Sequence, residues 1–186
     1  MVKKRSRFGV ILADPPWNYN NTGVEGSAAG QYQTMTDNEI ASLPVAKIAA
    51  DDSVLLLWAT WPKLDVAIQI VNEWGFRYVT GFPWIKIESL GRSLFDDQIE
   101  IKPFYGVGFW VRGCSEPILI GRRGSPERPN FDYYGLLSPN LYHSRKPDDL
   151  YEYAESLNGP YLEMFARRKR TNWSSWGNEI ESDLEL

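Results

Sequence analysis

Residues 8–17, with the sequence FGVILADPPW, are the stretch from which the fold can be read. The first six residues form a continuous apolar run of the length expected for a strand buried on both faces. Asp14 follows at once, and Pro15 and Pro16 fix two φ angles and favour an extended Asp14. Ligands of open α/β sheets bind beyond the carboxyl ends of the strands. The stretch therefore predicts an α/β protein with its DPPW segment at the ligand-binding edge.

The four residues Asp14, Pro15, Pro16 and Trp17 combine two kinds of recognition. The Asp14 carboxylate and the Pro15 carbonyl are both acceptors, and two acceptors side by side suit an exocyclic amine with its two N–H donors. The Trp17 indole offers a flat face on which a planar ring can stack. An aminated planar ring is a nucleobase, so adenine and cytosine both fit. The alternative is a plain strand end followed by a proline turn, with Asp14 as a cap and Trp17 buried.

Several further segments follow in a fixed order. They are ADPPW at 13–17, YQTM at 32–35, LLLWAT at 55–60, PWIK at 83–86, HSRKPD at 143–148, LEMFAR at 162–167 and WGNE at 176–179. Together they resemble the MT-A70 family of adenine-N6 methyltransferases, which use S-adenosyl-L-methionine, and the small bacterial and phage members in particular. The resemblance implies a Rossmann-like α/β methyltransferase fold. It also implies circular permutation, with the catalytic DPPW strand before the cofactor strand.

The resemblance implies roles for individual residues. The catalytic residues are Asp14, Pro15, Pro16 and Trp17. The cofactor-binding residues are Asp14, Lys146, Glu163, Phe165, Arg167, Asn178 and Glu179. The substrate-binding residues are Trp17, Tyr19, Lys86 and Arg145. Within this set, Lys146 would reach the methionine end of the cofactor and Arg167 its ribose hydroxyls, whereas Glu163 has an alternative role as an ion-pair partner of either.

This sequence departs from the family pattern at positions that bind the adenine of the cofactor. Longer members have a histidine and an asparagine after the arginine, where this chain has a shorter segment, 168–171 with the sequence RKRT, and no histidine. They also use an aspartate upstream of DPPW, and the sequence before Asp14 holds no counterpart. A further family pattern, W-x-R-x-x-x-E-x-x-L, is matched here by residues 110–119, and we expect Arg112 and Glu116 to form a structural pair.

The rest of the chain alternates strands and helices around long loops. We expect strands at 53–60, 76–87 and 161–166, and helices at 62–74 and 147–157. The helix at 62–74 should bury Leu64, Ala67, Ile68, Val71 and Trp74, which share one face. The first two strands and this helix form a β-α-β unit, so the sheet should be partly parallel. Mobile loops are predicted at 18–34, 88–108 and 121–142, the second as an insertion that contacts the polynucleotide.

Composition restricts the classes of function. The length of 186 residues predicts one domain, 1–186, and the net charge of −4 argues against a protein that coats nucleic acid non-specifically. Basic clusters, such as the one at 167–170, leave room for a local basic rim. One cysteine and one histidine allow neither a disulfide nor an ordinary zinc site. With no signal peptide and no apolar run long enough for a membrane, we expect a cytoplasmic protein.

Several functions remain open from the sequence. We expect methylation of adenine N6 in DNA, by analogy with the small bacterial and phage members, and RNA is the alternative polymer. A catalytically inactive partner subunit is disfavoured because the DPPW residues and Lys146 are all present. A cytosine amino-methyltransferase and a nucleic-acid-binding module without chemistry are weaker alternatives. The family often pairs subunits, so the chain could form a homodimer or pair with a related subunit.

Overall fold

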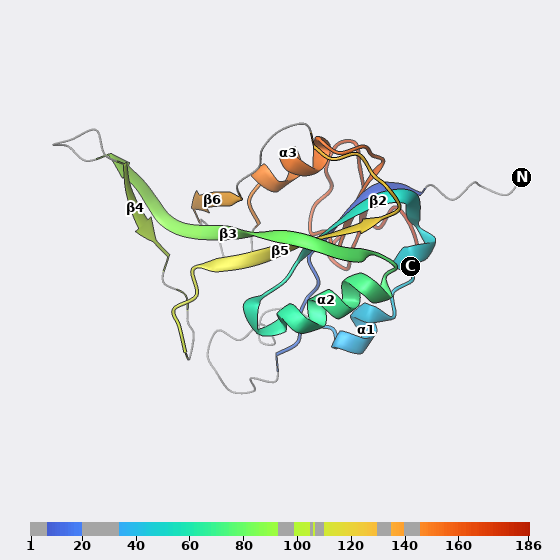
Figure 1. The fold of residues 1–186 in the computed structure, drawn as a ribbon, viewed down its shortest axis with the longest axis horizontal. Coiled ribbons are helices and arrows are strands. Elements are labelled where there is room, and N and C mark those ends of the chain that lie inside the picture. Colours follow the sequence, from blue (N-terminus) through green and yellow to red (C-terminus); the bar gives the residue numbers. More distant parts are fainter. Residues whose placement is uncertain are drawn as a thin grey trace, which may run out of the picture.

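β1 (Phe8–Ala13) is the strand around which the structure is built, and all six of its residues are buried. It pairs in parallel with β2 (Ala49–Trp58) on one side and with β7 (Tyr161–Met164) on the other. A strand that lies between two others and is covered on both faces needs a continuous apolar run rather than an alternating one. The buried strand predicted at residues 8–13 is therefore confirmed in the computed structural model (Figure 1).

Among the described residues the sheet has eight strands, in the order β4-β3-β5-β2-β1-β7-β8, and β6 pairs with β3. The other strands are β3 (Arg77–Arg92), β4 (Ile99–Pro103), β5 (Ser115–Arg123), β6 (Leu136–Pro139) and β8 (Trp173–Trp176). β8 runs parallel to β7, whereas β5 runs antiparallel to both of its neighbours, β2 and β3. The predicted α/β class is confirmed as a mixed sheet, with β5 inserted between the two strands of the predicted β-α-β unit.

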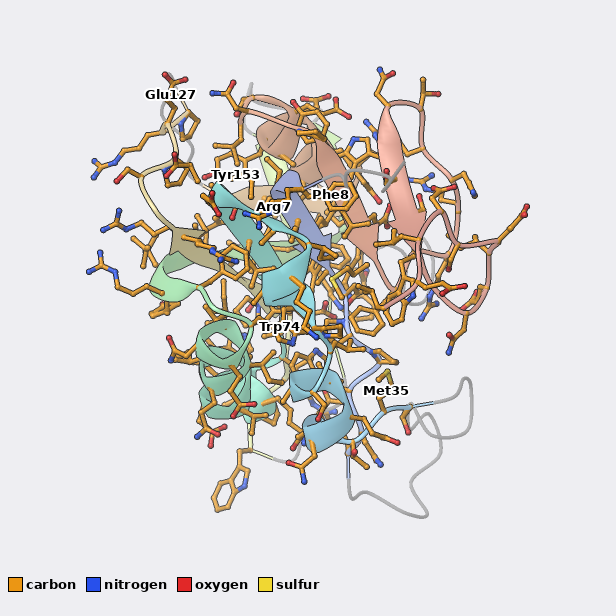
Figure 2. The ribbon with its side chains drawn as sticks, turned by 90° about the vertical axis from the view of Figure 1, so that its right-hand side faces the viewer. Arg7, Phe8, Met35, Trp74, Glu127 and Tyr153 are labelled. Atoms are coloured by element: carbon orange, nitrogen blue, oxygen red, sulfur yellow. The ribbon has the colours of Figure 1, made fainter. Side chains whose placement is uncertain are left out.

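Helices cover both faces of this sheet (Figure 1). α1 (Asp37–Ala41), α2 (Leu64–Glu73) and the 3₁₀ turns η2 (Val45–Lys47) and η3 (Trp61–Lys63) lie on one face, and α3 (Asp149–Glu155) lies on the other. Because side chains alternate along a strand, Ile11 joins the apolar core under α2 and Leu12 joins the core under α3. Figure 2 shows a residue of each core, Trp74 and Tyr153, on opposite sides of the sheet.

The predicted helix at 62–74 forms with small differences. The chain first makes the 3₁₀ turn η3 and then α2. Three of the predicted core residues are buried, namely Ala67, Val71 and Trp74. The other two, Leu64 and Ile68, are half-buried, and Ile70 is buried in addition. The amphipathic pattern thus gives the correct face of the helix but not its outer margin.

Two segments predicted as irregular loops contain strands, so these predictions are wrong for the described residues. The segment 88–108 holds the end of β3 and all of β4, which pair as an antiparallel arm that projects from the body (Figure 1). The segment 121–142 holds the end of β5 and all of β6, which pairs with β3. Both segments are stabilised by pairing with β3, β4 as the next strand along the chain and β6 as a strand much further on, and the local sequence pattern with its glycines and prolines does not reveal these pairings.

The structure describes residues 7–19, 34–92, 99–104, 106, 110–129, 135–139 and 146–186. Most of the predicted loop at 18–34 lies outside these ranges, and so do His143 and the predicted substrate residue Arg145. Within the described ranges, no helix is long and apolar enough to cross a membrane. The same part of the chain contains no group of three or more His, Cys, Asp or Glu side chains placed to hold a metal ion.

Candidate active site

The candidate site lies at the carboxyl ends of β1, β2 and β7. β1 pairs with β2 on one side and with β7 on the other. The chain therefore continues from β1 to one side of the sheet and later returns to the opposite side of β1. In open α/β sheets such a switch point leaves a crevice between the ends of neighbouring strands, and ligands bind there. Asp14 follows the end of β1 directly, and Phe165 follows the end of β7.

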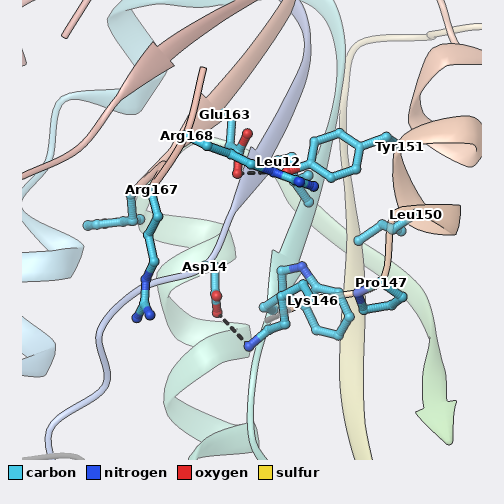
Figure 3. A pocket seen from close by; sticks show the side chains of 11 residues that line it. Leu12, Asp14, Lys146, Pro147, Leu150, Tyr151, Glu163, Arg167 and Arg168 are labelled. Carbon is cyan, nitrogen blue, oxygen red and sulfur yellow. Dashed lines mark hydrogen bonds and ion pairs between the residues drawn. The ribbon is translucent and has the colours of Figure 1, made fainter. Parts of the chain in front are cut away.

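A cavity of about 290 Å³ opens at this switch point (Figure 3). Its wall includes five residues predicted from the sequence, namely Asp14, Lys146, Glu163, Phe165 and Arg167. These residues come from both ends of the chain, and the parallel pairing of β1 with β7 brings them together. The wall is both charged and aromatic, which suits a polar ligand that carries a planar group.

Four charged side chains form a continuous series beside the cavity, which we call the charged ladder: Asp14, Lys146, Glu116 and Lys86. The Lys146 ammonium lies 3.0 Å from Asp14 Oδ1 and 3.1 Å from Glu116 Oε2. The other carboxylate oxygen of Glu116 lies 2.5 Å from Lys86 Nζ. Figure 3 shows the bond between Lys146 and Asp14 at the mouth of the cavity. Each inner member therefore contacts a charge of opposite sign on both sides.

Two buried tryptophans cover the cations of the charged ladder. Lys146 Nζ lies 4.9 Å from the ring centroid of Trp58, and Lys86 Nζ lies 4.7 Å from that of Trp84. The two rings meet edge to face, with centroids 5.8 Å apart. The electron-rich faces of the indoles stabilise the ammonium groups. The two tryptophans thus help to hold both lysines of the ladder in place.

Burial and the neighbouring charges shift the pKa values of Asp14, Glu116 and Lys146. Burial raises the pKa of the Asp14 carboxyl above its usual range, and the nearby Lys146 ammonium offsets part of this shift. Burial acts in the same sense on Glu116, but Lys146 and Lys86 together outweigh it and lower the pKa of that carboxyl. Burial alone would lower the pKa of Lys146, yet Asp14 and Glu116 raise it. Lys146 therefore stays charged, and Asp14 holds a proton more readily than an ordinary aspartate.

Glu163 lies on the opposite wall of the cavity, and its partner is not one of those considered from the sequence. Tyr151 donates a hydrogen bond of 2.8 Å to Glu163 Oε1 (Figure 3). The second oxygen, Oε2, is buried and has no hydrogen-bond partner among the described residues. Burial raises the pKa of the Glu163 carboxyl, and the Tyr151 bond offsets part of this shift. The site thus presents a buried acceptor that a ligand donor could satisfy.

The predicted ribose-side residues lie beyond the ends of β7 and β8. Arg167 Nε lies 3.3 Å from Glu179 Oε1, so the structure brings these two residues together, and Asn178 is the exposed neighbour of Glu179. Phe165 has a positive φ of 62° and packs edge to face on Trp176, with ring centroids 5.3 Å apart. The chain therefore turns sharply after β7 and exposes Arg167 at the rim of the cavity.

The DPPW segment differs from its predicted geometry in one respect. Trp17 is 5% exposed, packs in the core on the α2 side, and donates its N–H to the Trp58 carbonyl at 3.2 Å. The predicted open stacking face is therefore wrong for this structure, and the alternative of a buried Trp17 is correct. Of the other predicted substrate residues, Tyr19 bonds to the Thr60 hydroxyl and Lys86 belongs to the charged ladder.

Sequence reasoning missed Trp58 and Tyr151 on the cavity wall, and it assigned Glu116 to the wrong partner. Glu116 pairs with two lysines, whereas Arg112 is exposed. A signal for Glu116 was available, because a carboxylate at the start of an apolar strand requires a cation nearby. No comparable signal marked Tyr151, since its hydroxyl reaches Glu163 only through the packing of α3 against β7.

The fold and the cavity together define a class of protein. A mixed α/β sheet with a charged, ligand-sized cavity at its switch point fits a methyltransferase fold. The chain belongs to the MT-A70 family, whose model matches residues 8–179. The resemblance recognised from the sequence is thereby confirmed over nearly the whole chain.

Individual relatives cover almost all of this chain. It is 29% identical over 178 residues to the N(6)-adenosine-methyltransferase MT-A70-like protein of Arabidopsis thaliana, which covers 93% of the chain and 24% of the relative. Identity to the human N(6)-adenosine-methyltransferase catalytic subunit METTL3 is 28% over 181 residues, with 94% and 28% covered. For the human N(6)-adenine-specific methyltransferase METTL4 it is 30% over 191 residues, with 97% and 39% covered. The chain thus spans well under half the length of each relative.

Proposed function

We propose that this chain is an S-adenosyl-L-methionine-dependent methyltransferase that methylates the exocyclic N6 amine of adenine in a polynucleotide. The observation that carries the proposal is the position of Asp14, which follows β1 at the switch point and joins the cavity wall to the charged ladder. The names of the relatives refer to adenosine and adenine methylation at N6, which supports the same chemistry.

The residues of the cavity fit the proposed cofactor. S-adenosyl-L-methionine carries an ammonium, a carboxylate and ribose hydroxyls, and when bound it supplies an electrophilic sulfonium methyl group. The buried, unpartnered Glu163 Oε2 suits the ammonium group. Lys146 uses two of its donors on Asp14 and Glu116, and its third donor suits the carboxylate. The exposed residues Arg167, Asn178 and Glu179 would then hold the ribose.

Asp14 and the Pro15 carbonyl would bind the target amine. Pro15 O accepts the Trp17 N–H at 2.9 Å, which fixes the carbonyl and leaves its second lone pair for a ligand. Two acceptors on the amine hydrogens favour a tetrahedral nitrogen whose lone pair is localised and aligned for transfer, so most of the rate comes from positioning. The nitrogen becomes acidic only after it is methylated, and Asp14, with its raised pKa, then accepts the proton. Lys146 holds the Asp14 carboxylate in place throughout the reaction.

The polymer that carries the target adenine is DNA or RNA. We take DNA as the first substrate and RNA as the alternative, and in either polymer the adenine must leave its stack to reach Asp14. We also propose that the chain order is circularly permuted, since the catalytic strand β1 precedes the strand β7 that leads to the cofactor residues. A homodimer, or a pair with a related subunit, would supply nucleic-acid contacts beyond those of one chain.

Methyl transfer provides the test. Labelled S-adenosyl-L-methionine is incubated with single-stranded DNA, duplex DNA or RNA, and the products are identified by nucleoside mass spectrometry. We expect N6-methyladenine from the wild type and none from Asp14→Ala, while Asp148→Ala, which removes an exposed aspartate paired with Arg168, should keep its activity. Retained turnover in Asp14→Ala would contradict the role of Asp14. No transfer by folded wild type to any polymer would favour the alternative of an inactive partner subunit.

A further inference from the structure

Trp61 differs from most other tryptophans of the chain. Five of the eight tryptophans are buried, namely Trp17, Trp58, Trp74, Trp84 and Trp173. Trp61 is 53% exposed, although burial of an indole ring is strongly favourable. A single exposed apolar residue is ordinary on a protein surface. Trp61 becomes informative because its ring is both anchored and placed beside the active site.

A hydrogen bond and the local backbone fix the Trp61 ring. Its Nε1–H donates to Ser115 Oγ at 3.0 Å. Trp61 begins the 3₁₀ turn η3, which the Lys63 N–H closes on the Thr60 carbonyl at 2.9 Å, and the Lys63 ammonium pairs with Asp37 at 2.7 Å. The indole is therefore ordered before any ligand arrives, so a ring that stacks on it incurs little loss of side-chain entropy.

Both partners of the Trp61–Ser115 bond are chain neighbours of site residues. Trp61 follows the end of β2, where Trp58 lines the cavity, and Ser115 directly precedes Glu116 of the charged ladder. Because side chains alternate along β5, Ser115 faces the α2 side while Glu116 faces the ladder. The start of α2 and the start of β5 lie at the same edge of the sheet in Figure 1. Trp61 thus lies at the rim of the site rather than inside the cavity.

We propose that the Trp61 indole is a stacking platform for an unpaired nucleobase next to the target adenine. This inference rests on the proposed function, because it names a contact to the same polynucleotide. When the target leaves its stack, the neighbouring base loses a stacking partner, and a fixed aromatic face at the rim replaces it. Stacking on an aromatic side chain tolerates any base, because every base has a π face. The exposed face of one indole suits one base, and Trp17, being buried, cannot provide that surface.

The test compares Trp61→Ala with Trp61→Phe, which keeps an aromatic face. The binding partner is a short single-stranded oligonucleotide with one adenine and a 2-aminopurine at either flank. We expect Trp61→Ala to weaken binding and to raise the KM for the oligonucleotide about tenfold, with Trp61→Phe much closer to the wild type. In the wild type, quenching of 2-aminopurine should be strong at one flank only, and Trp61→Ala should abolish that difference. The affinity for S-adenosyl-L-methionine should not change.

The matched control is Tyr78→Ala, which removes an exposed aromatic side chain near the start of β3, where Tyr78 pairs with Gly121. It should leave oligonucleotide binding unchanged. Equal binding and equal quenching in Trp61→Ala and wild type would overturn the stacking role while leaving the proposed function intact. Unchanged oligonucleotide binding with an altered oligomeric state would overturn it in favour of a contact between protein chains. If the wild type neither bound nor methylated the oligonucleotide, both proposals would fail together.

Discussion

Two groups of ion pairs in this molecule have the same chemistry and different surroundings. The charged ladder draws Asp14, Lys86, Glu116 and Lys146 from four separate parts of the chain, and its side chains are 17–30% exposed. The basic segment, which we define as residues 167–170, is continuous in sequence. Its cations pair with Glu179, Asp148, Asp183 and Glu155, and the side chains in these pairs are 29–56% exposed. Each cation of the basic segment is thus paired with an exposed or partly exposed carboxylate, whereas charges from separate parts of the chain form the charged ladder beside the cavity.

Burial and connection to further charges, rather than the number of charges, should decide what an ion pair contributes to stability. An exposed pair gains little because water screens it and the side chains lose entropy. A buried pair is costly to break, because removal of one partner leaves the other charge without compensation. The two groups should therefore respond very differently to equivalent substitutions.

The largest effect is expected for Lys146→Met, which removes the central cation of the charged ladder and keeps the aliphatic stem. Asp14 and Glu116 would be left facing each other without the cation that they share. We expect a loss of about 3 kcal/mol in the free energy of unfolding. Methyl transfer should also be lost. Urea denaturation and the methyl-transfer assay measure the two effects.

The control for that substitution lies in the basic segment. Arg168→Met breaks the pair with Asp148, in which both side chains are about half exposed. We expect a loss of no more than about 1 kcal/mol. Equal losses of stability in Lys146→Met and Arg168→Met would contradict the distinction between the two groups.

The pH dependence of the reaction should come from the charged ladder. Because burial raises the pKa of Asp14, the folded protein holds this proton more tightly than the unfolded chain does. Stability contributed by Asp14 is therefore present at low pH and is lost as the pH rises through the folded pKa. The target amine binds the ionised form of Asp14. The fall in kcat/KM at acid pH should therefore occur at a pH above the usual range of aspartate pKa values. Lys86→Met removes a positive charge from the ladder and should move this limb to higher pH.

A variant of the basic segment provides the comparison for the pH profile. Lys169→Met removes a cation that pairs with Asp183 outside the cavity. The acid limb should remain where it is in the wild type. An equal upward shift in Lys86→Met and Lys169→Met would show that overall charge, and not the ladder, controls the titration.

A smaller effect is expected for Tyr151→Phe, which removes the hydrogen bond to Glu163 Oε1. The pKa of Glu163 should rise further, because this bond favours the charged carboxylate. We expect the KM for S-adenosyl-L-methionine to increase about fivefold. Tyr161→Phe removes a hydroxyl that binds the Leu157 carbonyl at 2.8 Å, away from the cavity, and should affect stability alone. A cofactor KM unchanged by Tyr151→Phe would remove Glu163 from the cofactor site.

The smallest effect is expected when the basic segment is neutralised at Arg168 and Lys169 together. Because both cations already face carboxylates, their removal should release few counterions from a bound polynucleotide. We expect the affinity for an oligonucleotide to fall less than about twofold, with an unchanged slope against salt concentration. A clearly weaker salt dependence in the double variant would show that the segment contacts phosphates after all.

The sequence predicts the elements that its local patterns define. The apolar run at 8–13 gives β1, and the amphipathic pattern at 62–74 gives α2. β4 and β6 escape prediction, because each is short and is defined by pairing with β3 rather than by its own pattern. Elements that carry their own signal are found, and elements defined mainly by pairing with another strand are not.

The same distinction applies to the candidate site. Asp14, Lys146 and Glu163 follow from motifs, and the structure brings them to one cavity. The pairing of Glu116 with two lysines depends on β3, β5 and the segment before α3 meeting in space, so the sequence suggests a wrong partner, Arg112. Trp17 is predicted as an open face, yet the indole supplies a hydrogen bond to the Trp58 carbonyl instead. Motifs identify residues of the site, and packing determines which of these residues contact one another.

The position of β1 between β2 and β7 also governs how the protein is made. Val10 pairs with Val54 and with Tyr161, so one neighbour of β1 is synthesised soon after it and the other only near the far end of the sheet-forming sequence. Until β7 has left the ribosome, one edge of β1 keeps its backbone N–H and C=O groups unpaired and open to another nascent chain. Contacts so distant in sequence also slow folding. The candidate site therefore forms late in folding, and a chain truncated before β7 would present an aggregation-prone edge in place of that site.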